Sequence, residues 1–185
     1  MNQYKFQVNK EITSKPLFDE KTASSKNVNY PKVSIVTPSY NQGQFIEETI
    51  LSVKNQNYPN IEHIIIDGGS TDNTLEIMRK YDTAYNMHWI SEPDKGQADA
   101  INNGFKMSSG EIIGWLNSDD LYFDKDVVSV VVEKFGGWED VDIFYGHTVL
   151  INARNRLMRI LLVPKFNYER LRRMNYIPQP SVFFR

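Results

Sequence analysis

Four short apolar runs alternate with helix-like segments between residues 32 and 117, and this alternation limits the possible folds more than any other feature of the sequence. The runs are rich in β-branched residues and predict buried strands: KVSIVTPSY, IEHIIIDGG, MHWISEP and EIIGWLN. In segment 44–56, Ile46, Ile50 and Val53 share one helical face, and charged residues lie off it. This alternation predicts an α/β fold, a mostly parallel sheet with helices on both faces.

The remaining segments continue the pattern. Helices are expected over 71–81, 96–110, 124–137 and 167–175, and further strands over 141–152 and from 180 onward. The valines of segment 124–137 favour a strand. However, Val128, Val132 and Phe135 keep helical spacing, and Gly136-Gly137 ends the run, so we expect a helix there.

Length and composition indicate one globular domain. The chain has 185 residues, and 41% of them are hydrophobic, which suffices for one packed core. Residues 1–31 are polar and aperiodic, so we expect an N-terminal arm followed by a domain over 32–185. The formal net charge of −2 gives no sign of a nucleic-acid binder. The absence of cysteine excludes disulfides and thiol chemistry.

The sequence also bears on location. The N-terminal stretch MNQYKFQVNKEITSK lacks the apolar segment of a secretory signal. No run approaches the roughly 18 apolar residues that span a bilayer. We therefore expect a soluble, cytoplasmic protein, and peripheral membrane association stays open.

Polar and small residues follow each of the four predicted strands. In parallel sheets, ligands bind outside the carboxyl ends of the strands. The four ends are Thr37-Pro38-Ser39-Tyr40, Asp67-Gly68-Gly69-Ser70, Glu92-Pro93-Asp94-Lys95-Gly96 and Asn117-Ser118-Asp119-Asp120. Turn chemistry alone would place Gly, Pro, Asp and Ser there. It does not explain why carboxylates recur at three of the four ends, so we expect one shared binding site.

Two of these ends allow a structural as well as a functional interpretation. Asp67 follows three isoleucines, where a simple strand-to-helix turn would suffice, but its carboxylate could also accept hydrogen bonds from a base or ribose. Lys95 could meet a phosphate or simply belong to a turn. The chain has neither a P-loop nor a GxGxxG motif, so dinucleotide binding has little support.

The segment NSDD, residues 117–120, is the sharpest signal. One aspartate would suffice to cap the next helix, yet two stand side by side, and each resists ionisation beside the other. A divalent cation reverses that penalty, because Mg²⁺ and Mn²⁺ take carboxylate, water and phosphate oxygens. The pattern therefore predicts a Mn²⁺ or Mg²⁺ site at the Asp119–Asp120 pair, with a substrate diphosphate filling other positions.

Four motifs occur in an order that is specific as a set: VSIVTPSYNQ, IIIDGGSTDNT, SEPDKGQADAINNGF and GEIIGWLNSDDLY. Together they closely resemble the family 2 inverting glycosyltransferases, which have the GT-A fold. The resemblance is dense from Val33 to Asp126 and continues weakly through IPQPSVFFR. It implies a nucleotide-diphosphate-sugar donor, with a UDP-sugar as the expected case, and a saccharide or lipid-linked saccharide acceptor.

The resemblance also implies roles for individual residues. Nucleotide binding is expected from Thr37, Pro38, Ser39, Tyr40, Asp67, Asp94, Lys95, Gly96, Asn117 and Ser118. The family's Asp-x-Asp motif falls on Asn117 and Asp119. Because an amide is a poor cation ligand, Asp119 is expected as the first metal ligand and Asp120 as a weaker one. The family's catalytic base lies beyond the strand that PSVFFR begins, so we expect it past Arg185 in a longer chain.

Two other functions stay open. A nucleotidyltransferase also uses carboxylates and Mg²⁺, but it would be expected to carry a basic glycine-rich loop after the first strand, where TPSYNQGQ has one glycine and no lysine or arginine. A non-catalytic nucleotide-sugar-binding module would need no base. His63, His88 and His147 have no partner spacing, so we expect structural roles for them.

Overall fold

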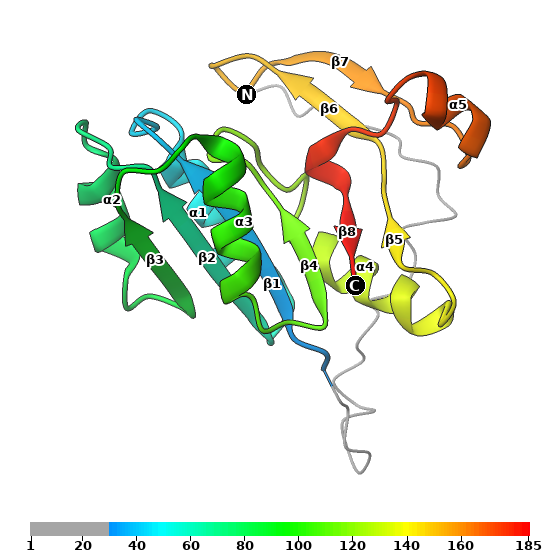
Figure 1. The fold of residues 1–185 in the computed structure, drawn as a ribbon, viewed down its shortest axis with the longest axis horizontal. Coiled ribbons are helices and arrows are strands. Elements are labelled where there is room, and N and C mark those ends of the chain that lie inside the picture. The colour runs from blue at the N-terminus through cyan, green and yellow to red at the C-terminus, as the bar shows by residue number, and fades with distance from the viewer. Residues whose placement is uncertain (1–29) are drawn as a thin grey trace, which may run out of the picture.

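The computed structural model describes residues 30–185, so the arm expected over 1–31 lies almost wholly outside the described residues. Within them, six strands form the main sheet in the order β3-β2-β1-β4-β8-β5, and β6 and β7 form a separate ribbon (Figure 1). The strands are β1 Val33–Ser39, β2 Ile61–Asp67, β3 Met87–Ser91, β4 Ile112–Trp115, β5 Ile143–Phe144, β6 Thr148–Ile151, β7 Leu157–Leu161 and β8 Phe183–Phe184. The helices are α1 Ile46–Lys54, α2 Thr74–Tyr81, α3 Gln97–Met107, α4 Val127–Gly137 and α5 Tyr168–Arg173, and a 3-10 turn, Gln179–Ser181, precedes β8.

The sheet is mostly parallel, as predicted. Strands β3, β2, β1 and β4 run parallel, whereas β8 pairs antiparallel with both β4 and β5. In the register, Ser39 pairs with Asp67, and Asp67 pairs with Ser91. The ends of β1, β2 and β3 therefore form one row at the carboxyl edge of the sheet.

Helices cover both faces of the sheet, which confirms the predicted layers (Figure 1). Helix α3 packs on β1 and β2, and a Cβ on its Gly104 would come within 2.3 Å of Val36 Cγ1. On the other face, α1 buries Ile46 and Ile50 in a cluster with Met78 of α2. No helix within residues 30–185 has the length and apolarity to cross a membrane.

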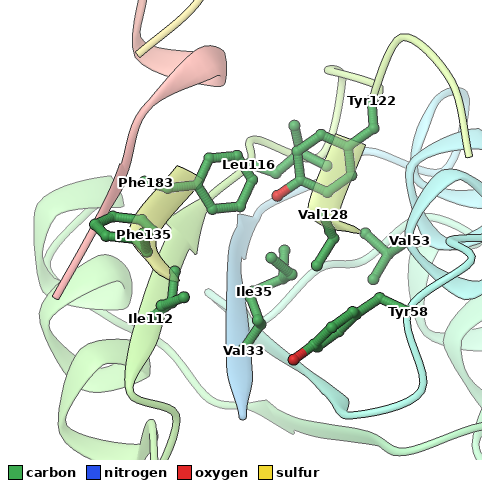
Figure 2. Packing of buried hydrophobic residues seen from close by; sticks show 10 residues of the cluster. All are labelled: Val33, Ile35, Val53, Tyr58, Ile112, Leu116, Tyr122, Val128, Phe135 and Phe183. Atoms are coloured by element: carbon green, nitrogen blue, oxygen red, sulfur yellow. The ribbon is translucent and has the colours of Figure 1, made fainter. Parts of the chain in front are cut away.

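A larger core cluster joins β1 and β4 to α4 and β8 (Figure 2). Phe183 of β8 is fully buried, and its ring stacks on Tyr122 with 5.7 Å between the ring centroids. Val128 and Phe135 of α4 are buried in the same cluster, which confirms the helix predicted from their spacing. The segment that ends in β8 is therefore part of the core.

Two predictions about secondary structure were wrong. Segment 141–152 is not one strand, because β5 pairs with β8 in the main sheet and β6 pairs with β7 in the ribbon. The connection between them is anchored at the far end of β7, where Tyr145 Oη donates to the Pro164 carbonyl and Val163 N–H donates to His147 Nδ1. Strand β7 was not predicted. Helix α3 ends at Met107 rather than Gly110, because Ser108 is already extended.

Candidate functional site

The carboxyl ends of β1 to β4 meet at one edge of the sheet, and the loops after β1 and β2 are docked on each other. Asn41, with a left-handed φ of 52°, donates its N–H to Ser70 Oγ and accepts from the Thr71 N–H through Oδ1. The Gly43 N–H donates to Asp72 Oδ2 at 2.9 Å. These bonds hold the two loops as one rim beside the strand ends.

Asp67 is fully buried at the end of β2, and its carboxylate organises the following turn. Its Oδ2 accepts from the N–H groups of Gly69 and Ser70 and from Ser91 Oγ of β3. Its Oδ1 accepts from Ser70 Oγ at 2.5 Å. Both oxygens are thus engaged inside the protein, so Asp67 shapes the row of strand ends, and a direct contact with a base stays a prediction.

Asp94 connects the end of β3 to the end of β2. Its Oδ1 accepts from the Gly96 N–H at 2.8 Å, and its carboxylate lies against Gly68, where a Cβ would come within 2.9 Å of Asp94 Oδ2. Gly96 has a φ of 107°, which favours glycine, and it precedes α3. Lys95 is exposed beside them, so this edge of the sheet carries a positively charged side chain.

Asn117 is the centre of a hydrogen-bond network that joins three segments. Its Oδ1 accepts from Gln97 Nε2 at 3.0 Å and from Trp115 Nε1 at 2.9 Å. Its Nδ2 donates to Asp120 Oδ2 at 3.2 Å and to Gln179 Oε1 at 2.9 Å. These four bonds use the whole capacity of a carboxamide. An ionised aspartate has no donor and could not make the last two.

Helix α1 supports the turn that carries the two aspartates. The Thr49 side chain is buried, and its hydroxyl lies 2.9 Å from the carbonyl oxygens of both Ser118 and Asp120. The Asp120 N–H donates to the Asn117 carbonyl at 3.1 Å. Ser118 is itself buried. The backbone of the turn that carries Asp119 and Asp120 is therefore held in place by hydrogen bonds from the protein interior.

Asp119 is exposed and Asp120 is half-buried. Burial, followed by the charge of Asp119, raises the pKa of Asp120 to about 6, while the hydrogen bond from Asn117 acts in the opposite direction. Residues 30–185 hold no group of three or more His, Cys, Asp or Glu side chains that could bind a metal by itself. A hard cation at this pair would have to take its remaining ligands from water and a diphosphate, and metal binding here stays a prediction.

The end of β1 presents one unpaired hydroxyl and one exposed ring. Thr37 and Pro38 are buried, and Thr37 Oγ1 lies 2.9 Å from His63 Nε2 in the interior. Ser39 is also buried, and within the described chain its Oγ has no hydrogen-bond partner. Tyr40 is 60% exposed. Because a buried polar atom usually has a partner, Ser39 marks a place where a ligand could supply one.

Sequence reasoning missed three residues that hold the site together: Thr49, Gln97 and Gln179. Thr49 was detectable, because it places a hydroxyl on the buried stripe that Ile46 and Ile50 define. The two glutamines reach Asn117 across 20 and 62 positions of the chain. No local pattern points to contacts over such separations.

The fold and the polar edge define the class of nucleotide-diphospho-sugar transferases with the GT-A fold. More specifically, the chain belongs to the glycosyl transferase family 2, whose family model matches residues 34–184. It is 28% identical to S. aureus TarS, solved as its fragment 1–349 in complex with UDP-GlcNAc, with a TM-score of 0.56 over 60% of this chain and 33% of that one.

Two curated relatives show the same kinship. The chain is 39% identical over 138 residues to the putative teichuronic acid biosynthesis glycosyltransferase TuaG of Bacillus subtilis, covering 73% of this chain and 54% of TuaG. It is 38% identical over 117 residues to the uncharacterized glycosyltransferase Rv1514c of Mycobacterium tuberculosis, covering 63% of this chain and 44% of that protein. The chain thus spans about half the length of these relatives.

Proposed function

We propose that this protein is a metal-dependent inverting glycosyltransferase, which transfers a sugar from a nucleotide-diphosphate donor to an acceptor hydroxyl in polysaccharide or glycoconjugate synthesis. The observation that carries the proposal is the Asp119–Asp120 pair at the end of β4, beside the assembled ends of β1, β2 and β3. The complex of TarS with UDP-GlcNAc supports a UDP-sugar as the donor. The similarity to TuaG, a putative teichuronic acid biosynthesis glycosyltransferase, supports a polysaccharide as the product class.

The nucleoside half of the donor would lie along the ends of β1 to β3. Ser39 Oγ would gain there the partner that it lacks within the described chain. The exposed Tyr40 ring would offer an apolar face to the base. Lys95, exposed at the rim, would face the phosphates as a counter-charge.

The diphosphate half would face Asp119 and Asp120. A divalent cation, Mn²⁺ or Mg²⁺, would neutralise the negative charge that these carboxylates and the leaving diphosphate share. Asn117 would orient Asp120 through its Nδ2, and Thr49 would hold the backbone of the turn. Without a cation the acidic edge would repel the donor.

In the transfer, the oxygen of the acceptor hydroxyl attacks the anomeric carbon opposite the diphosphate. A new carbon–oxygen bond forms, the bond from the anomeric carbon to the phosphate oxygen breaks, and UDP leaves with the electron pair. The hydroxyl proton passes to a general base. We propose a saccharide or lipid-linked saccharide as the acceptor.

Product analysis tests this proposal. The protein as the cell makes it, rather than residues 1–185 alone, is incubated with a panel of UDP-, GDP- and dTDP-sugars, Mn²⁺ and saccharide acceptors, and the phosphate-containing products are separated. We expect UDP and a lengthened saccharide. Release of pyrophosphate would assign a nucleotidyltransferase instead, and metal-dependent donor binding without any product would assign a binding module.

A further inference from the structure

One surface of the molecule combines exposed apolar side chains with exposed basic ones. It comprises residues 150–174, which run from β6 through β7 to α5, and is called the basic–apolar surface below. Met158 is 69% and Leu162 is 73% exposed. Other exposed apolar residues on it are Leu150, Ile151, Leu157, Ile160, Phe166, Tyr168 and Met174. A small soluble domain rarely gathers so many exposed large apolar side chains in one place.

The geometry of the ribbon places apolar residues together. Side chains alternate between the two faces of a strand, so Met158 and Ile160 share one face of β7, and Leu157, Arg159 and Leu161 share the other. Val149 of β6 pairs with Ile160 and extends the same face. An isolated two-stranded ribbon is marginally stable in water, so this apolar face would gain from being covered.

The charge of the basic–apolar surface indicates which kind of partner would bind it. Residues 150–174 contain seven basic residues and one acidic residue, a net charge of +6, whereas residues 1–149 contain thirteen basic and twenty-two acidic residues, a net charge of −9. The single acidic residue, Glu169, is paired with Arg172. Arg154, Arg156, Arg159, Lys165, Arg170 and Arg173 are all exposed. The natural counterpart of such a surface is both apolar and negatively charged.

The surface lies close to the proposed donor site. Figure 1 shows the ribbon along the edge toward which the parallel strands point. At the tip of the ribbon, Asn155 Nδ2 donates to Glu48 Oε2 in the first turn of α1 at 2.9 Å. At its other end the chain continues into Gln179, which contacts Asn117. Whatever binds this surface is held beside the strand ends.

We propose that the basic–apolar surface docks the protein on an anionic lipid bilayer, with apolar side chains entering the headgroup region and arginines facing lipid phosphates. The exposed apolar residues are mainly aliphatic rather than aromatic, which favours lipid over nucleic acid. A consequence, which rests on the proposed function, is that the donor edge faces the membrane, so that the acceptor is a saccharide carried on a membrane lipid.

Vesicle co-sedimentation tests the proposal without any donor or acceptor. Residues 1–185 are mixed with vesicles of phosphatidylcholine alone or with one part phosphatidylglycerol to three parts phosphatidylcholine. We expect binding to the anionic vesicles only, weakened by salt. The double variant Arg156→Gln/Arg159→Gln should bind about fivefold more weakly for each arginine neutralised. Met158→Ser/Leu162→Ser should weaken binding while keeping its salt dependence.

A matched control is Lys106→Gln/Lys134→Gln, which neutralises two exposed lysines on α3 and α4 and should bind vesicles like the unaltered chain. Thermal melting with UDP and Mn²⁺, run on every variant, reports folding and donor binding separately from lipid binding. Failure of the donor shift alone would therefore contradict the proposed function and leave the docking surface standing.

Several results would overturn the docking proposal. These are absence of binding to anionic vesicles, equal binding to both vesicle types, equal loss in the control variant, or preferential binding to a single-stranded oligonucleotide. Self-association that the Met158→Ser/Leu162→Ser variant abolishes would assign the surface to a second copy of the chain. Vesicle binding by residues 1–185 that disappears in the protein as the cell makes it would assign the surface to the protein's own further chain.

Discussion

Asn117 Nδ2 and Gln179 Oε1 are joined by a hydrogen bond of 2.9 Å, although 62 positions separate the two residues in the chain. Gln179 also donates from Nε2 to the backbone carbonyl of Trp115 at the end of β4. The turn with the acidic pair is thereby coupled to the segment that leads into Phe183 and the core. A substitution at either Asn117 or Gln179 should therefore change how much the other residue contributes to stability.

A double-mutant cycle measures that coupling. Asn117→Ala and Gln179→Ala, made singly and together, should show an interaction of about 0.5–3 kcal/mol in the free energy of unfolding. The control cycle combines Asn117→Ala with Lys134→Ala on the exposed face of α4, and those effects should add within about 0.5 kcal/mol. Additive effects for Asn117 and Gln179 would show that the bond contributes no coupling.

Asn117→Asp separates the structural role of the amide from metal binding. The aspartate loses the two donor bonds to Asp120 and Gln179, so in EDTA the variant should be less stable by about 1–3 kcal/mol. A third carboxylate beside the pair should preserve or strengthen Mn²⁺ binding, so the stabilisation by Mn²⁺ should be at least as large as in the unaltered chain. Asn117→Ala should lose the same amount of stability in EDTA, but Mn²⁺ should not stabilise it more than the unaltered chain. Melting scans with and without Mn²⁺ check both variants, and equal behaviour of the two would contradict this account.

Thr49→Val tests whether α1 positions the turn. The substitution keeps the shape but removes the only donor that Thr49 offers to the Ser118 and Asp120 carbonyls, at a cost of about 1–3 kcal/mol. It should also weaken metal-dependent UDP binding, whereas Thr49→Ser, which keeps the hydroxyl, should retain most of it. If Thr49→Val lowers stability but leaves the UDP affinity unchanged, the hydroxyl has no role in positioning the acidic pair.

His63 predicts how stability depends on pH. Burial lowers its pKa from 6.5 to about 3, so below pH 6.5 the unfolded chain binds one more proton than the native state at this residue. This contribution to stability is complete above pH 6.5 and falls by about 1.4 kcal/mol per pH unit below it. Denaturant unfolding of the unaltered chain and of His63→Gln should reveal this slope as the difference between them.

Two other residues, Asp120 and Glu62, also make the free energy of unfolding depend on pH. Their contributions are the same in the unaltered chain and in His63→Gln, so they cancel in the difference between the two proteins. Asp120, with a raised pKa, adds stability as the pH falls through about 6 toward 3.8, so its slope has the opposite sign. Burial acts to raise the pKa of Glu62, but hydrogen bonds from Lys32 and Ser34 lower it to about 2, so its contribution is lost only between pH 4.5 and 2. Parallel curves for the two proteins between pH 5 and 6.5 would contradict a neutral buried His63.

The parts of the fold that local patterns specify were predictable. The stripe of Ile46, Ile50 and Val53 gave α1, and the apolar run ending at Asp67 gave β2. The ribbon was not predictable, because β5 and β6 join different sheets, and the contacts that hold the connection between them, such as Tyr145 to Pro164, lie far along the chain.

The candidate site divides in the same way. The strand ends and the acidic pair stand out as local motifs. The burial of Asp67, by contrast, depends on Ser91 of the neighbouring strand. Likewise, the four bonds of Asn117 depend on Gln97 and Gln179, which only the folded chain brings near. Partners chosen by tertiary packing leave no periodic signal in the sequence.

Titration calorimetry of UDP tests the central claim, a cation bridge at Asp119, most directly. In the unaltered chain, UDP should bind at least about tenfold more tightly with Mn²⁺ than with EDTA, a difference of ~1.4 kcal/mol. Asp119→Ala should abolish this difference, Asp120→Ala should reduce it less, and Asp140→Ala, which removes an exposed carboxylate after α4, should leave it intact. Equal UDP affinity of the unaltered chain in Mn²⁺ and in EDTA would contradict the account.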